Sequence, residues 1–350
     1  MTDRIRAFIK VTTRKKRLLL LAALAGICSH ASAQTPYLAT WEGKAQGTYY
    51  IVKCLATDTL GLQQGIDSIF QVIDQSLSLY KPGTLINQFN AGRKVKMDAH
   101  LKAVVTKALF TSRITGGAFD ITVKPLMDVW GFGVIKPAVQ QVPPADSIRK
   151  VLEKVGYKYL RMKGNWLIKK KPGVEIDCNG IAQGYTSDVI ANFLAQRGIS
   201  NYLVDVGGEL CAKGHNQHNK VWSVGIERPA PGDTTFYAPE QAIVHLSDQA
   251  ITTSGNYRRF FDQGGKRFAH TMDPATGQAL QSNIISVTVI AKDGITADAF
   301  DNPLILMGVE KGMAFLQQHP ELQLEAYFIY KSADGSIDEK YTPGFAPFLQ

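Results

Sequence analysis

Residues 175–185 read EIDCNGIAQGY and mark a change from an extended segment to a helix. An apolar stretch ends at Asp177, and Gly180 then opens a segment with apolar residues at helical spacing: Ile181, Tyr185, Val189 and Phe193. Free backbone N–H groups at a helix start suit a phosphate, but the nearby carboxylate would repel it unless it binds a sugar hydroxyl or works beside a metal. An ordinary capped strand–helix turn explains the same residues, so this motif alone does not identify a site.

The same periodicity predicts further helices and strands on both sides of this motif. The predicted helices are residues 62–79, a helix around 101–109 that stops at Gly116-Gly117, one from Asp146 or Ser147, the one that ends at Gly198, and 297–318. The predicted strands are 43–54, 201–212, 220–227, 243–250, 284–292 and 324–331, with a hairpin at 165–178 that turns at Lys171-Pro172-Gly173 and loops at 137–145 and 228–240. Successive strands with scattered helices and no strong linker predict an α+β protein that forms a single compact unit.

The first 33 residues have the features of a secretory signal peptide. Basic residues precede a short apolar run, Leu18 to Ile27, and Ala31-Ser32-Ala33 predicts cleavage before Gln34. A membrane anchor is an alternative, but the apolar run is about half as long as a spanning helix requires. Lipid attachment at Cys28 is a second alternative, although Ile27 precedes it where lipoprotein signals usually have a small residue. We therefore expect an exported protein, periplasmic or attached to the periplasmic face of a membrane, whose functional domain is residues 34–350.

Composition excludes several classes of function. The whole chain has a net charge of +9, but seven basic residues and one acid lie in the first 33 residues, which leaves +3 for the other 317. No basic stripe stands out there, so we expect no nucleic-acid partner. Three cysteines remain, and their odd number and spacing favour buried free thiols over a disulfide framework or a zinc site: Cys54, Cys178 and Cys211. The motifs of dinucleotide-binding, P-loop, zinc-protease and serine-hydrolase sites are absent from the sequence.

Three further clusters contain residues suited to ligand chemistry. In GGAFDITV, residues 116–123, Phe119 offers a stacking face and Asp120 an acceptor for a ligand N–H or hydroxyl. The segments TTSGNY (252–257) and HTMDPATG (270–277) contain His270, a candidate general base, although a lone histidine is more often structural. In ADAFDN (297–302), two carboxylates and an amide oxygen suit Mg²⁺, whereas a helix cap would explain only one of the acids.

In the order in which they occur along the chain, the four clusters resemble the ApbE family of FAD:protein FMN transferases. The resemblance runs from Gly47-Thr48 to Gly308 and includes SLY at 78–80 and NYLVDVGGEL at 201–210. It implies a T-fold-like core of mixed sheets packed with helices. It also implies Mg²⁺-dependent transfer of FMN from FAD to a threonine of an acceptor protein, such as a membrane redox complex subunit or an FMN-binding domain, with release of AMP. The alternatives are an FAD-binding protein without transfer activity and an FAD pyrophosphatase that yields FMN and AMP.

The resemblance also implies roles for individual residues. Those at FAD-contacting positions are Gln46, Tyr80, Ala118, Phe119, Asp120, Asp177, Gln183 and Met272. Those at Mg²⁺ positions are Gly180, through its carbonyl, Asp298, Asp301 and Asn302, and the residue at the position of the base is His270. The chain departs from the family twice, with Gln183 where lysine is common and Asn302 where threonine is common. Asn302-Pro303 is typical of an N-cap and N1 pair, which predicts a later start for the last long helix than in relatives.

Overall fold

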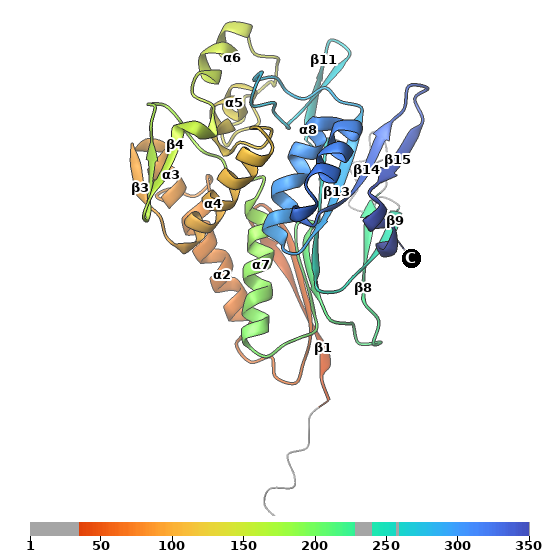
Figure 1. Ribbon diagram of the computed structural model, residues 1–350. Helices are drawn as coiled ribbons and strands as arrows, with labels where there is room; N and C mark the ends of the chain where they lie inside the picture. The colour runs from red at the N-terminus through yellow and green to blue at the C-terminus, as the bar shows by residue number, and fades with distance from the viewer. Residues whose placement is uncertain (1–34, 228–239, 257–258, 350) are drawn as a thin grey trace, which may run out of the picture. The chain divides into compact units, whose positions relative to one another are not determined.

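An eight-stranded sheet forms the centre of the fold in the computed structural model, which describes residues 35–227, 240–256 and 259–349 (Figure 1). The strand order is β1-β2-β6-β7-β10-β13-β14-β15, and each neighbouring pair is antiparallel. These strands are β1 (Tyr37–Ala45), β2 (Thr48–Ala56), β6 (Tyr202–Val206), β7 (Glu209–Lys213), β10 (Gln249–Gly255), β13 (Ile284–Ala291), β14 (Glu325–Lys331) and β15 (Ile337–Tyr341). The predicted signal peptide and residues 228–239 of the predicted loop lie outside the described residues.

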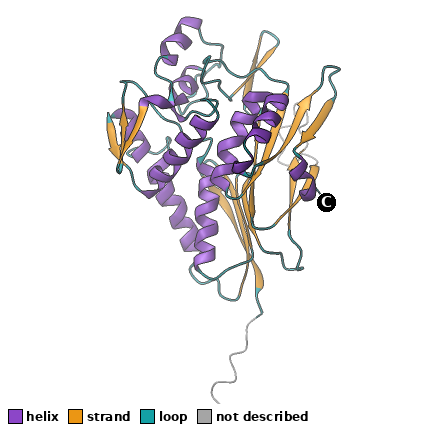
Figure 2. Ribbon diagram, in the orientation of Figure 1, coloured by secondary structure: helices purple, strands orange, loops and turns teal. Residues whose placement is uncertain are grey.

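Long helices lie on one face of the sheet (Figure 2). Helices α7 (Ala182–Gln196) and α8 (Gly294–Gln318) pack directly on its strands. Helix α2 (Leu62–Leu77) packs on α7 and, through Phe70, against Tyr50 of β2, and α4 (Ala99–Ile114) packs on α8 and α2. Side chains along β6 point alternately to the two faces of the sheet, so the core has two parts. Val204 packs with Ile190 of α7 on one face, and Leu203 packs on the opposite face. That side is covered by Trp222 and Val244 of a second hairpin, β8 (Trp222–Glu227) and β9 (Glu240–Leu246). The arrangement confirms the predicted α+β class, and the described residues from 37 to 349 form one compact unit.

Smaller elements surround this core. A three-stranded sheet has the order β3-β5-β4, and a separate hairpin pairs β11 with β12. Their bounds, with those of the short helices, are β3 (Lys94–Lys96), β4 (Leu160–Lys163), β5 (Trp166–Lys169), β11 (Phe260–Gln263), β12 (Lys266–Ala269), α3 (Leu85–Ala91), α5 (Lys124–Val129) and α6 (Ala145–Leu152). No helix in the described ranges has the length and apolar character needed to cross a bilayer. The three described cysteines are free and buried, as predicted.

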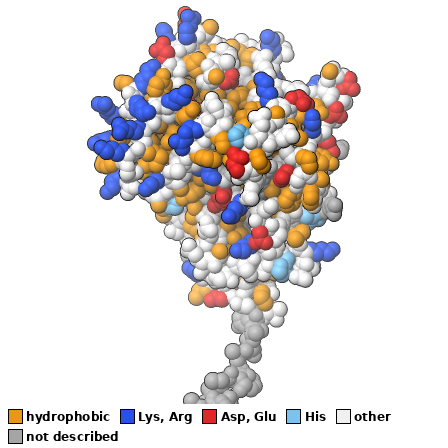
Figure 3. All heavy atoms as spheres, viewed as in Figure 1, with side chains coloured by type: hydrophobic (Ala, Val, Ile, Leu, Met, Phe, Trp, Pro, Cys, Tyr) orange, Lys and Arg blue, Asp and Glu red, His pale blue; other side chains and the backbone are white. Residues whose placement is uncertain are grey.

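Basic side chains gather over the three-stranded sheet (Figure 3). Lys96 and Lys163 both pair with Trp166 across the strands, and Lys94 Nζ lies 4.7 Å from the centroid of the Trp166 ring. These cations come from segments far apart in the chain, so no run of basic residues marks the patch in the sequence. No basic stripe stands out in the sequence, and this surface forms only because the fold brings these strands together.

Several predicted single strands are in fact hairpins. The predicted strand 43–54 crosses the turn Gln46-Gly47 between β1 and β2, and the predicted strand 201–212 crosses Gly207-Gly208 between β6 and β7. Likewise, 243–250 joins the end of β9 to the start of β10. The alternation of apolar residues continues across two-residue turns, so periodicity alone does not reveal where the chain turns.

The predicted hairpin at 165–178 is also wrong. Its strands are β4 and β5, which meet at Gly164-Asn165, where Gly164 supplies the positive φ of 57° that the tight turn uses. Residues 174–178 form no strand because their backbone N–H groups bond elsewhere. Ile176 N donates to Asn90 Oδ1, and Asp177 N donates to the carbonyl of Ile121.

The last long helix begins earlier than predicted. Helix α8 starts at Gly294, and Asp293 is its N-cap because Asp293 Oδ1 accepts from Thr296 N at 2.9 Å. Asn302-Pro303 is therefore not an N-cap and N1 pair, since Pro303 lies inside the helix, which continues to a kink at Gly308. Asp298 and Asp301 consequently lie within the first two turns rather than at a cap.

Candidate functional site

The site forms where the start of α7 meets the start of α8. A Cβ atom on Gly184 would lie 2.3 Å from the carbonyl oxygen of Gly294, and one on Gly294 would lie 2.5 Å from the carbonyl oxygen of Gly184. Only glycine allows the two backbones to approach this closely. The contact brings α8 close enough for Gly184 N to donate to Asp298 Oδ2 at 2.8 Å.

The residues predicted to hold Mg²⁺ come together at this crossing. A Cβ on Gly180 would lie 3.2 Å from Asn302 Nδ2, which places the Asn302 side chain beside Gly180. Strand β10 supports the other side of α8, since Thr252 Oγ1 donates to Asp301 Oδ2 at 3.2 Å and Ser254 Oγ donates to Asn302 Oδ1 at 3.0 Å. The amide of Asn302 thus turns its nitrogen toward Gly180, and it must rotate before its oxygen can face a metal there.

Three acidic side chains at this crossing lack a compensating charge. Burial raises the pKa of Asp298 to about 7, and burial together with the charge of Asp298 raises the pKa of Asp301 well above its usual range. On β7, burial and then the charges of both aspartates raise the pKa of Glu209, whose Oε2 is buried without a hydrogen-bond partner. No ion pair with a lysine, arginine or histidine reaches these three groups within the described part of the chain. Such a cluster fits a bound cation.

The donor set indicates which kind of cation fits. No group of three or more His, Cys, Asp or Glu side chains is spaced to hold a metal ion by itself among the residues the structure describes. A metal here would therefore need oxygen atoms from the Gly180 carbonyl, the Asn302 amide or a bound phosphate. Mg²⁺ binds in this way, through one or two carboxylates plus phosphates and water. The residues present fit Mg²⁺ on these grounds.

A second acidic region joins two of the predicted flavin segments. Asp177 N donates to the carbonyl of Ile121 at 2.7 Å, and Asp177 Oδ1 accepts from Asn179 N at 2.8 Å. Asp120 Oδ1 accepts from both N and Oγ1 of Thr122, and Asp120 Oδ2 accepts from Tyr157 N. Burial raises the pKa of both aspartates. Both segments are thus tied together by backbone contacts.

The aromatic and apolar candidates are placed differently from expectation. The ring of Phe119 is buried in the main core, so it offers no free stacking face. Met272 is buried beside Leu126, whereas Tyr80 is 59% exposed. Ala118, between Gly117 and Phe119, is half-buried. No described contact joins the Tyr80 ring to the other candidates, so its place in the site remains a prediction.

Two of the predicted flavin-contacting residues, Gln46 and Gln183, lie near the start of α7. Gln46, in the turn between β1 and β2 with φ of 52°, donates from Nε2 to Thr186 Oγ1 at 3.0 Å, while its Oε1 is buried without a partner. Gln183 Nε2 would lie 3.0 Å from a Cβ on Gly207, which places it beside the turn between β6 and β7. The unpartnered acceptor of Gln46 is consistent with a polar ligand at this end of α7.

His270 is a neutral imidazole at pH 7. Burial, followed by the charge of Arg259, lowers the pKa of His270 to about 4, and His270 Nδ1 is buried with no hydrogen-bond partner among the described residues. The ring meets Phe132 edge-on, with centroids 6.5 Å apart. Arg259 also acts electrostatically on Asp177, so it links the histidine region to the flavin segments.

Sequence reasoning missed Arg259 and Glu209. Arg259 follows TTSGNY by one intervening residue, and Glu209 lies inside NYLVDVGGEL, so both were next to quoted motifs. Neither has a local pattern that separates it from a surface charge. The signal for both is their position in the folded chain.

Two surface cavities are lined by other residues, although one of them includes Tyr157, whose N–H donates to Asp120. One of about 440 Å³ is lined in part by Gln71, Gln88 and Asp98, and the other, of about 360 Å³, is lined in part by Arg113 and Tyr157. Neither is lined by a residue of the predicted site. We therefore assign the site from the convergence of side chains rather than from cavity size.

Comparisons with known proteins agree with this assignment. A family model described as the ApbE family matches residues 46–328. A protein named FAD:protein FMN transferase from Vibrio cholerae serotype O1 is 33% identical over 338 residues, which cover 94% of this chain and 98% of the relative. A protein of the same name from Escherichia coli K12 is 33% identical over 318 residues, which cover 88% of each chain.

Solved structures share the fold as well. The flavin transferase ApbE from Vibrio cholerae superposes with a TM-score of 0.81 at 33% identity, covering 90% of this chain and 100% of the other. The apo form of the Pseudomonas stutzeri flavinyl transferase ApbE gives a TM-score of 0.81 at 29% identity, covering 91% and 98%. These matches confirm the fold and the resemblance inferred from the motifs. The chain therefore belongs to the ApbE family.

Proposed function

We propose that this protein performs its transferase reaction, the transfer of FMN from FAD to an acceptor protein, with Mg²⁺ as cofactor and a threonine hydroxyl as the acceptor group. The transferase activity follows from relatives named FAD:protein FMN transferase that match nearly the whole chain. The observation that carries the metal proposal is the set of buried acidic side chains, Asp298, Asp301 and Glu209, without a compensating cation in the described residues. Buried charges of one sign are costly unless a counter-charge accompanies them.

The proposed ion would be held by the Gly180 carbonyl, Asp298, Asp301 and, after rotation of its amide, Asn302. A bound Mg²⁺ would supply positive charge to neutralise the pyrophosphate and the charge that develops on the phosphoryl oxygens. The start of α7 adds the partial positive charge of a helix N-terminus. In our proposal the other end of FAD is bound by the FAD-contacting set named above, in which Asp120 and Asp177 are already fixed by the fold.

His270 is the proposed base. Because its pKa is about 4, the imidazole is unprotonated at neutral pH and able to accept the proton of the acceptor threonine. The threonine oxygen then forms a bond to the FMN phosphorus, the bond to the AMP oxygen breaks, and AMP leaves. So low a pKa makes a weak base, and we expect electrostatic stabilisation of the phosphoryl oxygens to supply most of the rate enhancement.

The direct test is incubation with FAD, Mg²⁺ and a candidate FMN-binding acceptor domain, followed by mass measurement of both proteins. We expect the acceptor to gain one FMN, AMP to appear in equal amount, and EDTA to stop both. An acceptor with its target threonine replaced by valine is the control and should gain no mass. FMN and AMP released without acceptor labelling would favour the pyrophosphatase alternative, and FAD bound without turnover would favour a binding protein.

We also propose that the protein is exported. The support is the basic segment, short apolar run and Ala31-Ser32-Ala33 of the first 33 residues. N-terminal sequencing of protein from its native host should begin at Gln34. An intact Met1 on cytoplasmic protein would contradict export, and a lipidated Cys28 would show a membrane-attached form.

A further inference from the structure

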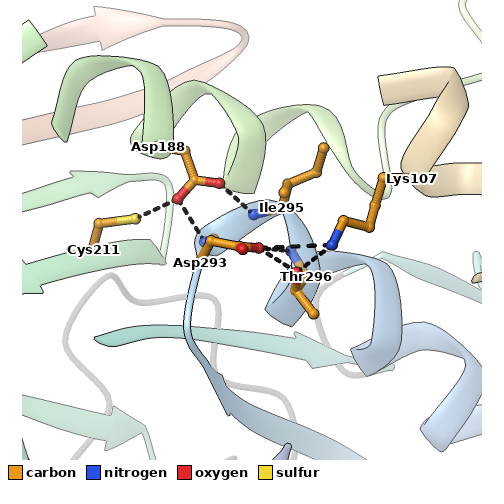
Figure 4. Close-up of polar contacts among 7 residues, drawn as sticks. Lys107, Asp188, Cys211, Asp293, Ile295 and Thr296 are labelled. Carbon is orange, nitrogen blue, oxygen red and sulfur yellow. Dashed lines mark hydrogen bonds and ion pairs between the residues drawn. The ribbon is translucent and has the colours of Figure 1, made fainter. Parts of the chain in front are cut away.

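Asp188 of α7 binds the start of α8 with both carboxylate oxygens (Figure 4). Its Oδ1 accepts from Gly294 N at 2.7 Å, and its Oδ2 accepts from Ile295 N at 2.8 Å. Cys211 Sγ on β7 also donates to Asp188 Oδ1, at 3.2 Å. Asp188 therefore satisfies two of the N–H groups that a helix leaves free at its first turn.

The same helix also has a local cap. Asp293 Oδ1 accepts from Thr296 N, and Lys107 Nζ donates to Thr296 Oγ1 at 2.6 Å and lies 3.9 Å from Asp293 Oδ1 (Figure 4). Asp293 belongs to the turn just before α8, so its bond supports helix formation wherever the helix lies. Asp188 is separated from Gly294 by 106 residues and belongs to another helix. Its bonds depend on where α8 lies relative to α7.

The two helices are thus joined at two points, one turn apart on each. Gly184 N bonds to Asp298, and Asp188 bonds to Gly294 and Ile295, with the close contact of Gly184 and Gly294 between them. With two bonded points, α8 can neither slide along α7 nor rotate about a single contact. Because α7 begins just after Gly180, this connection determines where the acidic residues of α8 lie relative to the Gly180 carbonyl.

We propose that Asp188 is a positioning residue for the metal site, which holds α8 on α7 so that Asp298 and Asp301 lie beside Gly180. It touches neither the ion nor the substrate in this proposal, which rests on the proposed Mg²⁺ site. Burial raises the pKa of Asp188 to about 6, so its carboxylate is mostly ionised at neutral pH and interacts favourably with the N-terminal end of α8. Groups that orient metal ligands in this way typically change metal affinity about 10- to 100-fold when they are altered.

The test compares Asp188→Asn with Asp293→Asn, since both weaken a cap of the same helix. Three quantities are measured: Mn²⁺ affinity by electron paramagnetic resonance with FAD present, FAD affinity in EDTA, and the melting temperature. We expect both variants to melt at lower temperature, and only Asp188→Asn to lose about 10- to 100-fold in Mn²⁺ affinity. FAD affinity in EDTA should stay within about threefold of the unsubstituted protein in both variants, because most of the predicted flavin contacts, such as Tyr80 and Asp120, lie on elements other than α7 and α8.

Wild-type Mn²⁺ affinity in Asp188→Asn, or an equal loss in Asp293→Asn, would overturn the positioning role while leaving the metal site intact. No Mn²⁺ binding by the unsubstituted protein with FAD would overturn the metal site and, with it, this inference. If Asp188→Asn does not fold, Asp188→Glu provides the same comparison. It keeps the charge but is one methylene longer, so it should displace α8 and give an intermediate loss of Mn²⁺ affinity, and unchanged affinity there would contradict the proposal.

Discussion

The acidic residues of the flavin region and of the α7–α8 crossing are similarly buried but differently bonded. Asp120 accepts three hydrogen bonds from Thr122 and Tyr157, which use both of its oxygens. Asp298 accepts one from Gly184, and after burial its negative charge raises the pKa of both Asp301 and Glu209. The difference indicates that Asp120 is part of the fold, whereas the crossing needs a ligand to balance its charge. Burial alone would not have separated the two.

The largest expected effect comes from removing a carboxylate at the crossing. Asp298→Ala should reduce transfer at least about 10²- to 10³-fold, because the lost group stabilises charge that grows in the transition state. Much of the FAD binding should persist, because most of the predicted flavin contacts, such as Tyr80 and Asp120, lie on elements other than α7 and α8. Initial rates across a Mg²⁺ titration, with calorimetric FAD affinities, measure both effects. Full transfer activity in this variant, or activity undiminished by EDTA, would refute the metal assignment.

The second prediction compares the stability of the two regions directly. Without metal at about pH 8, Asp120→Asn should lower the free energy of unfolding by about 1–3 kcal/mol, because its amide cannot accept from all three donors. Asp298→Asn should leave that free energy unchanged or raise it, because it removes an uncompensated buried charge. Urea unfolding of each variant beside the unsubstituted protein gives both values. Equal losses in the two variants would show that the regions do not differ as described.

A third prediction follows from the pKa of Asp298, about 7 in the folded chain against 3.8 ordinarily. Across that interval the folded protein binds more protons than the unfolded chain, so this group's contribution to the free energy of unfolding falls as pH rises from about 4 to about 7. Mg²⁺ binds the ionised carboxylate. The rise in melting temperature caused by saturating Mg²⁺ should therefore be larger at about pH 8 than at about pH 5. A shift that does not vary with pH would argue against binding at Asp298.

The smallest effect is expected at Asn302, which already bonds to Ser254. Asn302→Thr keeps one neutral oxygen and should retain activity within about threefold, whereas Asn302→Leu removes the ligand and should raise the Mg²⁺ concentration needed for half-maximal rate about tenfold. Rates measured across a Mg²⁺ series distinguish the two variants. Leucine tolerated as well as threonine would remove Asn302 from the metal set.

Local patterns were sufficient for much of the helical structure. The apolar spacing that predicted 62–79 corresponds to α2, and the spacing in 181–193 corresponds to α7, because each helix buries one face whose period the sequence shows directly. The hairpins at Gln46-Gly47 and Gly207-Gly208 were missed, since side-chain alternation does not record where the chain reverses. The start of α8 was missed because its N-cap, Asp293, lies before residue 297, where the helix was predicted to begin.

The sequence by itself determined the family, the segments that carry the site and the residue types available for a metal and a phosphate. Only the tertiary structure decided which acids are satisfied by hydrogen bonds within the fold, as Asp120 is, and which lack a counter-charge among the described residues, as Asp298 and Asp301 do. It alone showed that Asp188 contacts α8, 106 residues away, and that Glu209 faces the same cluster. The physical reason is that charge compensation and hydrogen bonding depend on distances of a few ångströms between segments, and separation along the chain carries no record of those distances.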